Sequence, residues 1–466
     1  MTAHPRRQWS PPRSQRPRPP PGGDVNTIPW IPAPARPIVF KNASVVDVAN
    51  NTVNRSQTVV LENGVFTSVS HNWNVVVPNA RVFDLEGLYL CPGLVDCHVH
   101  INMSDGRPSS GYTEPHLRAT YTLKAMLARG FTTVRDVGGA TFAQAQAVKQ
   151  WLTPGPRLFQ GGNILSQTGG HGDPRSRESP AASLCCAPVP EMSVLADGVD
   201  AVTHTTRELM RQGADHVKIC TSGGVSSPTD ALKSVQFSPA EIRAITSTVA
   251  DMQGTLVTSH AYTVPAIRRA VENGVRGIEH GNLLDRDTAK LLASTGTFLT
   301  PTLMISTAKG RAPWNDTLPD YMREKNAKVR DAGRRAIQIA EEEGVTVCFG
   351  TDLTMGMGYL QSEEFTQRAQ LLPSHRVLAH ATTNAAKLLN DDKIGVIAAG
   401  AYADCLVLPT NPLVDVRVLD VGDDGRHGGI WGVVRDGRIV VARGEFAELV
   451  EDVGGLDVVL GIDEAK

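Results

Sequence analysis

The heptapeptide LVDCHVH (residues 94–100) places His98 and His100 two residues apart at the end of an apolar run. Side chains at positions i and i+2 of a β-strand point to the same face, so the two imidazoles can bind one ion together. Imidazole nitrogens are common ligands of zinc and similar divalent ions. The stretch therefore predicts a strand that ends in part of a metal site, and further ligands are expected at the ends of other strands.

The middle of the chain, residues 94–391, alternates strand-like runs with amphipathic helical stretches. Eight runs have strand character: 94–100, 131–137, 157–165, 215–220, 255–260, 276–280, 297–303 and 345–352. Several of the helical stretches between them end at Gly, as helices commonly do. This alternation predicts an α/β fold, a (β/α)8 TIM barrel with its active site at the carboxyl ends of the strands. A doubly wound sheet is the alternative, but no G-x-G-x-x-G follows the first strand.

Short alternating β segments flank this middle part on both sides. Residues 37–93 and 392–466 contain hairpin-like runs, with turn signals at Asn63-Gly64 and Asp436-Gly437, and the second range also includes a C-terminal tail. We expect a small β-sandwich domain built from both chain ends. Residues 1–36 are rich in Pro and Arg, which predicts a disordered tail, with a proline-motif ligand or a transit peptide as alternatives.

Composition and charge argue against several classes of function. The chain has 466 residues, a net charge of −2 and a pI of 6.7, which predict no nucleic-acid and no membrane partner. No run is long and apolar enough to span a bilayer. Seven scattered cysteines without a C-x-x-C pair favour a reducing compartment. Since no apolar signal core follows the N-terminus, a cytoplasmic location is expected.

Residue types that bind metals recur at the ends of the later strand candidates. The six candidates are His98 and His100 in the first run, Lys218 in the fourth, His260 in the fifth, His280 in the sixth and Asp352 in the eighth. Lys218 and His260 lie 42 residues apart, and His260 and His280 lie 20 apart, so each interval accommodates one strand–helix repeat. A single His at a strand end is more often a hydrogen-bonded core residue. Six candidate ligands at matching positions predict one metal centre at the barrel mouth.

The order His-x-His, Lys, His, His, Asp resembles that of the amidohydrolase superfamily. The flanking motifs CPGLVDCHVH (91–100), GFTTVRDVGG (130–139), FGTD (349–352), NAAKLL (384–389) and ADCLVLPTNPL (403–413) extend the resemblance over nearly everything from Ile38 to Gly444. SQTGGHGD (166–173), HVKICTSGGV (216–225) and SHAYT (259–263) are most similar to its branch of metal-dependent Xaa-Pro dipeptidases, prolidase-like carboxypeptidases and ochratoxinase. The resemblance to imidazolonepropionase is weaker.

The resemblance implies a binuclear metal-dependent amidohydrolase that cleaves a C–N amide bond. Two Zn²⁺ per chain are expected, one held by His98, His100 and Asp352 and the other by His260 and His280. In members with a lysine on the fourth strand, that lysine is carbamylated and bridges the two metals.

Lys218 would take this bridging role. A lysine buried beside cations has a depressed pKa and can react with carbon dioxide as a free amine. The alternative is that Lys218 remains an ordinary ammonium and pairs with Asp352.

Catalytic and substrate-binding roles follow from the same resemblance. A metal-bridging hydroxide would attack the carbonyl, and Asp352 would pass its proton to the leaving amine. Tyr262 shares the strand face of His260 and would stabilise the oxyanion or contact the substrate, unless it only packs at the barrel mouth. His171 in a glycine-rich loop and Arg175 close by are further candidates for substrate binding. The alternatives are a backbone-bonded histidine and a solvated arginine.

Dipeptides or N-acyl amino acids are the expected substrates, ochratoxin-like amides among them. One alternative is a cyclic amide or lactone hydrolase, including a mononuclear imidazolonepropionase-like enzyme, against which Lys218 argues. Another is a non-catalytic barrel, which should have lost ligands, whereas all six groups are present. Residues 172–197 and 304–320 are expected to wall the pocket. The resemblance also implies a homo-oligomer, whose subunit number the sequence does not fix.

Overall fold

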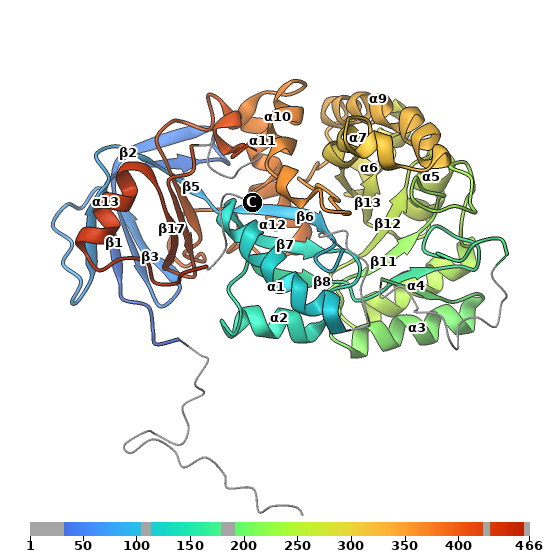
Figure 1. Cartoon of the computed structure of the whole chain (residues 1–466), viewed down its shortest axis with the longest axis horizontal. Helices are drawn as coiled ribbons and strands as arrows, with labels where there is room; N and C mark the ends of the chain where they lie inside the picture. Colours follow the sequence, from blue (N-terminus) through green and yellow to red (C-terminus); the bar gives the residue numbers. More distant parts are fainter. Residues whose placement is uncertain (1–31, 104–112, 179–191, 423–428, 461–466) are drawn as a thin grey trace, which may run out of the picture.

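The computed structural model describes residues 32–103, 113–178, 192–422 and 429–460. The predicted tail, residues 1–36, thus lies almost entirely outside the described residues. In Figure 1 a β-rich part made from both ends of the chain lies beside a larger α/β part. This arrangement follows the order of the sequence, in which β segments flank a region of alternating strands and helices.

The two ends of the chain share one eight-stranded sheet, in the order β17-β16-β15-β5-β1-β2-β3 with β4 beside β1. Its strands are β1 (Ile38–Asp47), β2 (Thr52–Glu62), β3 (Val65–Ser70), β4 (Arg81–Asp84), β5 (Tyr89–Pro92), β15 (Cys405–Leu408), β16 (Gly432–Arg435) and β17 (Arg438–Ala442). The antiparallel pairing of β15 with β5 joins the two ends. Phe40, Phe83 and Phe446 meet in its core with ring centroids 5.5–6.3 Å apart. The predicted division into the two packed sheets of a sandwich is not confirmed.

Parallel strands in two further sheets form the centre of the α/β part. One sheet has the order β6-β7-β8 and the other β10-β9-β11-β12-β13-β14. The strands are β6 (Leu94–Val99), β7 (Phe131–Asp136), β8 (Arg157–Gln160), β9 (Ile164–Ser166), β10 (Ser193–Leu195), β11 (Val217–Cys220), β12 (Val257–Ala261), β13 (Gly277–His280) and β14 (Phe298–Thr300). Almost all of their residues are buried, because helices cover the sheets from outside (Figure 1).

The predicted barrel of eight strands does not close as one continuous ladder among the described residues. The third candidate run, 157–165, separates at Gly161-Gly162 into β8 and β9, which belong to different sheets. Gly162 has φ +64°, a left-handed conformation that ends the strand. The parallel strands thus have the connectivity of a TIM-type barrel, with an interrupted ladder.

The eighth candidate run, 345–352, is irregular. Val347 makes an isolated parallel bridge to Leu299, and no longer ladder includes it among the described residues. Its backbone still joins both neighbours, since Cys348 N donates to Leu299 O at 2.8 Å and Cys97 N donates to Phe349 O at 2.9 Å. The run therefore lies between β14 and β6, which brings Asp352 to His98.

Helices follow most of the parallel strands. They are α1 (Thr113–Ala128), α2 (Phe142–Lys149), α3 (Val199–Arg211), α4 (Pro239–Asp251), α5 (Val264–Glu272), α6 (Arg286–Thr295), α7 (Leu303–Lys309), α8 (Trp314–Thr317), α9 (Asp320–Glu342), α10 (Glu363–Ala369), α11 (Ser374–His380), α12 (Thr383–Leu389) and α13 (Gly444–Asp452). Helix α4 shows the local signals clearly, with Pro239 in its first turn and a capping box between Ser238 and Glu241. Helix α6 ends at Gly296, which has φ +66°.

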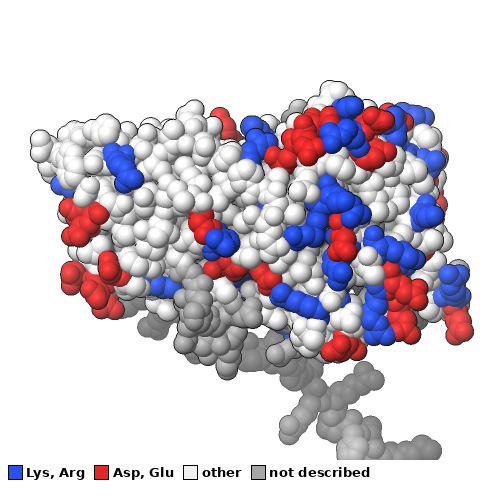
Figure 2. Space-filling view, turned by 90° about the horizontal axis from the view of Figure 1, so that it is seen from above, with Lys and Arg blue, Asp and Glu red and all other residues white. Residues whose placement is uncertain are grey.

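Over the face in Figure 2, Lys and Arg side chains lie beside Asp and Glu among the described residues. Such mixing gives no wide field of one sign on this face. Among the described residues, none of the helices combines the length and apolar composition that crossing a membrane requires.

Candidate metal centre and active-site pocket

Strand register brings the predicted ligands of three neighbouring strands to one edge. Residues 217–220 of β11 pair with 257–260 of β12, so that Cys220 lies opposite His260. In the next pair, Ala261 of β12 lies opposite His280 of β13. Because the strands are parallel, His260 and His280 lie at their carboxyl ends, and Lys218 lies two residues before the end of β11.

The ligand atoms of His98, His280 and Asp352 lie within 4.8 Å of one another. Asp352 Oδ1 is 3.4 Å from His98 Nε2 and 3.3 Å from His100 Nε2. The rings of His260 and His280 are also neighbours, with centroids 4.7 Å apart. The structure thus brings the four predicted histidines and Asp352 together in one cluster.

Three of these imidazoles have their Nδ1 atoms engaged from behind. His98 Nδ1 lies 2.7 Å from Glu279 Oε2. His100 Nδ1 lies 2.9 Å from the carbonyl oxygen of Gly138, and His280 Nδ1 lies 2.7 Å from Thr302 Oγ1. Such contacts orient the rings and leave each Nε2 for a metal. His260 is reversed, since its Nε2 lies 3.2 Å from the Gly223 carbonyl oxygen and its Nδ1 remains for a ligand.

The donor set fits a divalent ion such as zinc. Burial lowers the pKa of His260 and His280 well below the usual value, so both rings are neutral and have a lone pair to donate. Burial would raise the pKa of Asp352, but the charges and hydrogen bonds of His98 and His100 outweigh it and hold that pKa well below the usual value. Neutral imidazoles around an ionised carboxylate are the ligands that zinc prefers.

Two of these residues have left-handed backbones. His280 has φ +72° and Asp352 has φ +56°, and Gly281 after His280 has φ +62°. A histidine in this region is uncommon and costs on the order of 1 kcal/mol, whereas Asp tolerates it better. Strain of this kind persists where the surroundings fix it, and it clusters at functional sites.

Lys218 is buried, with 3% of its surface exposed. Burial, the largest influence, lowers its pKa, and the nearby charges of Glu279 and Asp352 oppose this only in part. No ion pair joins Lys218 to Asp352 within the part of the chain that the structure describes. The lysine therefore has the environment of a readily deprotonated amine.

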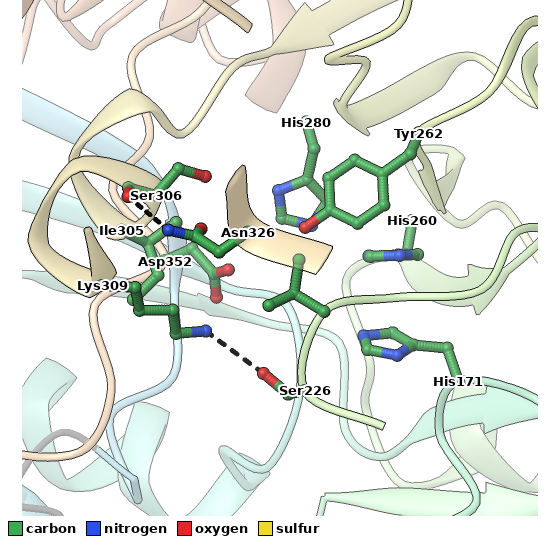
Figure 3. Close-up of a pocket in the computed structure, with 11 residues that line it drawn as sticks. His171, Ser226, His260, Tyr262, His280, Ile305, Ser306, Lys309, Asn326 and Asp352 are labelled. Carbon is green, nitrogen blue, oxygen red and sulfur yellow. Dashed lines mark hydrogen bonds between the residues drawn. The ribbon is translucent and has the colours of Figure 1, made fainter. Parts of the chain in front are cut away.

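A pocket opens beside the cluster (Figure 3). It is lined by His171, Val225, Ser226, His260, Tyr262, His280, Ile305, Ser306, Lys309, Asn326 and Asp352. His171 and Tyr262 flank His260, with ring centroids 4.0 Å and 4.7 Å from it. Residues 305–309 come from α7, within the segment predicted to wall the pocket.

His171 and Tyr262 offer uncharged polar groups to this pocket. His171 Nδ1 lies 2.8 Å from Ser227 Oγ, and burial lowers the pKa of the ring to about 4. Burial raises the pKa of the Tyr262 phenol, so its hydroxyl keeps its proton and can donate a hydrogen bond. Both side chains lie where the sequence predicted substrate contacts.

Arg175 is not among the residues that line this pocket. Its guanidinium pairs with Asp173, two residues before it, with Nε–Oδ1 and Nη2–Oδ2 distances of 2.8 Å and 2.6 Å. A role in substrate binding stays a prediction, and this pairing disfavours it.

Several residues of this site could not be identified from the sequence. Glu279 stands directly before a predicted ligand, and Arg135 contacts it from 144 residues away in the chain. Ser226 and Lys309 line the pocket but carry no motif that marks them. The proximity of Glu279 to His280 in the sequence was the one available signal.

Comparisons with known proteins agree with this geometry. Residues 89–440 match the profile described as "Amidohydrolase family". An amidohydrolase of known crystal structure is 41% identical, with a TM-score of 0.81, and the alignment covers 88% of this chain and 100% of the other. A prolidase solved in complex with N-methylphosphonate-L-proline is 38% identical, with a TM-score of 0.82, covering 87% of this chain and 100% of that one.

Ochratoxinase from Aspergillus niger is 29% identical over 366 residues, which are 71% of this chain and 72% of the relative. The prolidase and the ochratoxinase confirm the branch expected from the motifs around residues 166–173, 216–225 and 259–263.

Proposed function

Because the chain belongs to the amidohydrolase family and is a hydrolase of C–N bonds, we propose that it is a binuclear metal-dependent enzyme that cleaves the amide bond of a dipeptide or an N-acyl amino acid. The convergence of His98, His280 and Asp352 within 4.8 Å supports the metal centre. The similarity to a prolidase and to ochratoxinase supports the amide substrate.

Two zinc ions are proposed, with His98, His100 and Asp352 as ligands of one and His260 and His280 as ligands of the other. Lys218, as a carbamate, would be their shared ligand. Its burial and the absence of an ion pair to Asp352 among the described residues support this role. Bound metal ions supply a Lewis acid that polarises the carbonyl and lowers the pKa of water.

The protein's own residues then handle the proton and the developing charge. Asp352, kept ionised beside His98 and His100, takes the proton of the attacking water and passes it to the leaving nitrogen. The hydroxyl of Tyr262 donates a hydrogen bond to the carbonyl oxygen as negative charge develops there. His171, neutral and held by Ser227, contacts the substrate from the other side of His260.

Further features of the proposal concern the whole chain. We place it in the cytoplasm, because the five cysteines of the described residues are all free, as expected in a reducing compartment. We also propose a (β/α)8 domain over residues 94–391, a small β-sandwich domain from 37–93 and 392–466, and assembly as a homo-oligomer.

A substrate screen tests this function. The protein would be reconstituted with zinc and bicarbonate, and hydrolysis followed across dipeptides, N-acyl amino acids, lactams and lactones, as amine formed from the amides and as acid formed from the lactones, with Asp352→Asn as the inactive control. Release of amine from the linear amides, absent in the control, is the expected result. Turnover of lactams or lactones alone would overturn the substrate class and favour the cyclic amide hydrolase. No turnover of any substrate would contradict the proposal.

A further inference from the structure

Lys309, the last residue of α7, brings a buried ammonium to the active-site pocket. Only 6% of its surface is exposed, and its Nζ lies 3.2 Å from Ser226 Oγ (Figure 3). It is the only Lys or Arg among the described residues that line the pocket. No acidic partner within 4.0 Å is present for it in the described ranges, Asp352 included.

Lys325, in the same region, is a lysine whose ammonium has a full set of hydrogen-bond acceptors. Its Nζ donates to the carbonyl oxygens of Gly224, Ser227 and Asp230 at 2.9, 2.8 and 2.7 Å, and the Asp230 carboxylate lies 3.4 Å away. Lys325 therefore fixes the 224–230 loop. Within the described ranges, Lys309 has one neutral hydroxyl instead, and burying an ammonium without a counter-ion is costly.

Lys309 is held in place by the packing of its helix. Glu364 accepts hydrogen bonds from the backbone nitrogens of Leu303 and Met304, at 3.4 and 2.6 Å, at the start of α7. On the other side, Asn326 of α9 donates its side-chain amide to Ser306 O at 2.9 Å. The helix is therefore anchored at its start and along its length, so the ammonium is presented to the pocket at little entropic cost.

The position of Lys309 in the pocket indicates which part of a substrate would contact its ammonium. Lys309 and Asp352 line the same pocket, and Asp352 raises the pKa of Lys309 electrostatically, although burial lowers it more. In Figure 3 the ammonium is directed toward Ser226, while His171 and His260 lie across the pocket. Asp352 must reach the leaving nitrogen to protonate it. In an amino acid, the carboxylate is one carbon from that nitrogen, so it would lie close to Asp352, within reach of the cation that lines the same pocket.

We infer that Lys309 and Ser226 form the binding site for the α-carboxylate of the leaving amino acid. This inference rests on the proposed amide hydrolysis and adds the residues that select its substrates. Lys309 supplies the charge, and the Ser226 hydroxyl supplies a second hydrogen bond. The site would select substrates with a free C-terminal carboxylate over amides capped at that end.

Binding of reaction products tests the site without turnover. The zinc-reconstituted protein would be titrated calorimetrically with L-phenylalanine, L-proline, L-leucine and L-arginine, each beside its carboxamide. Lys309→Met, which is close in shape and removes one charge, would be compared with Lys290→Met on the exposed face of α6. We expect the preference for acid over amide to fall roughly 10- to 100-fold in Lys309→Met and to persist in Lys290→Met. A wild type without any preference, or a preference unchanged in Lys309→Met, would overturn the inference.

Kinetics separate this inference from the function on which it rests. For an N-acyl amino acid and its C-terminal amide, the ratio of kcat/KM should fall by a similar factor in Lys309→Met, mainly through KM, and by less in Ser226→Ala. An unchanged ratio in both variants would contradict the site. If the wild type releases no amine from any substrate, the proposed function fails, and the binding preference still decides the role of Lys309.

Discussion

His98 Nδ1 and Glu279 Oε2 lie 2.7 Å apart, and both side chains are buried. The second oxygen of Glu279 accepts from Arg135 Nη2 at 2.6 Å. Burial would raise the pKa of Glu279, but the charges of Arg135 and His98 outweigh it and hold that pKa well below the usual value. An ionised carboxylate only accepts hydrogen bonds, so it fixes the proton on Nδ1 and leaves Nε2 free to bind a metal.

Glu279→Gln should weaken metal binding. A glutamine amide can donate to Nδ1 of His98, which would leave the ring proton on Nε2 and remove the lone pair that faces the cluster. Loss of an orienting partner of this kind costs roughly 10- to 100-fold in metal affinity. Competition with a chromophoric zinc chelator measures the effect. Glu272→Gln, an exposed carboxylate paired with Arg268, is the matched control. Equal zinc affinity in both variants would refute the orienting role of Glu279.

Asp352→Asn should retain metal but lose turnover by about 10²- to 10⁴-fold, because the amide cannot shuttle a proton. Asn is the conservative choice here, since it tolerates the left-handed backbone at φ +56°. Metal content by elemental analysis and amine release would be measured on the same sample. Near-normal turnover would disprove the assigned role.

Lys218→Ala should lose activity and at least one metal per chain. Short carboxylic acids such as acetate or propionate can occupy the space left by a carbamate, so partial rescue by them is expected. Metal stoichiometry with and without bicarbonate, in wild type and variant, measures this. Full activity of the variant at one metal per chain would favour the mononuclear alternative.

Tyr262→Phe should lower kcat with little change in KM, by about 10²- to 10³-fold, which is typical for loss of one oxyanion donor. The ring stays packed against His260 and His280, with centroids 4.7 and 5.2 Å away, so the fold should be unaffected. Steady-state kinetics on a linear amide decide the point. A variant with unchanged kcat would show that Tyr262 only packs at the barrel mouth.

His380 should make the fold sensitive to acid. Burial, with smaller contributions from Arg368 and Arg376, lowers its pKa to about 4 despite the opposing effect of Glu341. Between pH 6.5 and 4 the unfolded chain binds a proton that the folded chain does not, so stability is present above this window and is lost as the pH falls through it. The loss attributable to this group is about 3 kcal/mol at most.

Urea unfolding of the metal-free protein at several pH values measures this, with His380→Gln for comparison. The wild type should lose more unfolding free energy than the variant between pH 6.5 and 4. Parallel losses in the two proteins would rule out His380 as the cause.

The alternation of strands and helices and the positions of the ligands at strand ends are local features, so the sequence alone predicted them. His98, His260, His280 and Asp352 meet because parallel strands end at one edge, and that rule needs no knowledge of distant contacts. The third strand run breaks at Gly161-Gly162. These glycines are a signal for the break, but the apolar residues on both sides make the run read as one strand.

Residues whose roles depend on distant partners could not be predicted in this way. Glu279 acquires its role from Arg135, and Lys309 is notable only because, among the described residues, no acidic side chain forms an ion pair with it. For Arg175 the partner was local. Asp173, two residues before it, forms a salt bridge with it, and the sequence alone could have suggested this pairing.

The dependence of amide hydrolysis on metal tests the central claim most directly. Metal-depleted protein would be titrated with zinc in the presence of bicarbonate, while amine release from an N-acyl amino acid is followed. We predict no activity without metal and a rise to a plateau at two zinc ions per chain. Full activity of the metal-free protein, or a plateau at one zinc ion, would contradict the binuclear account.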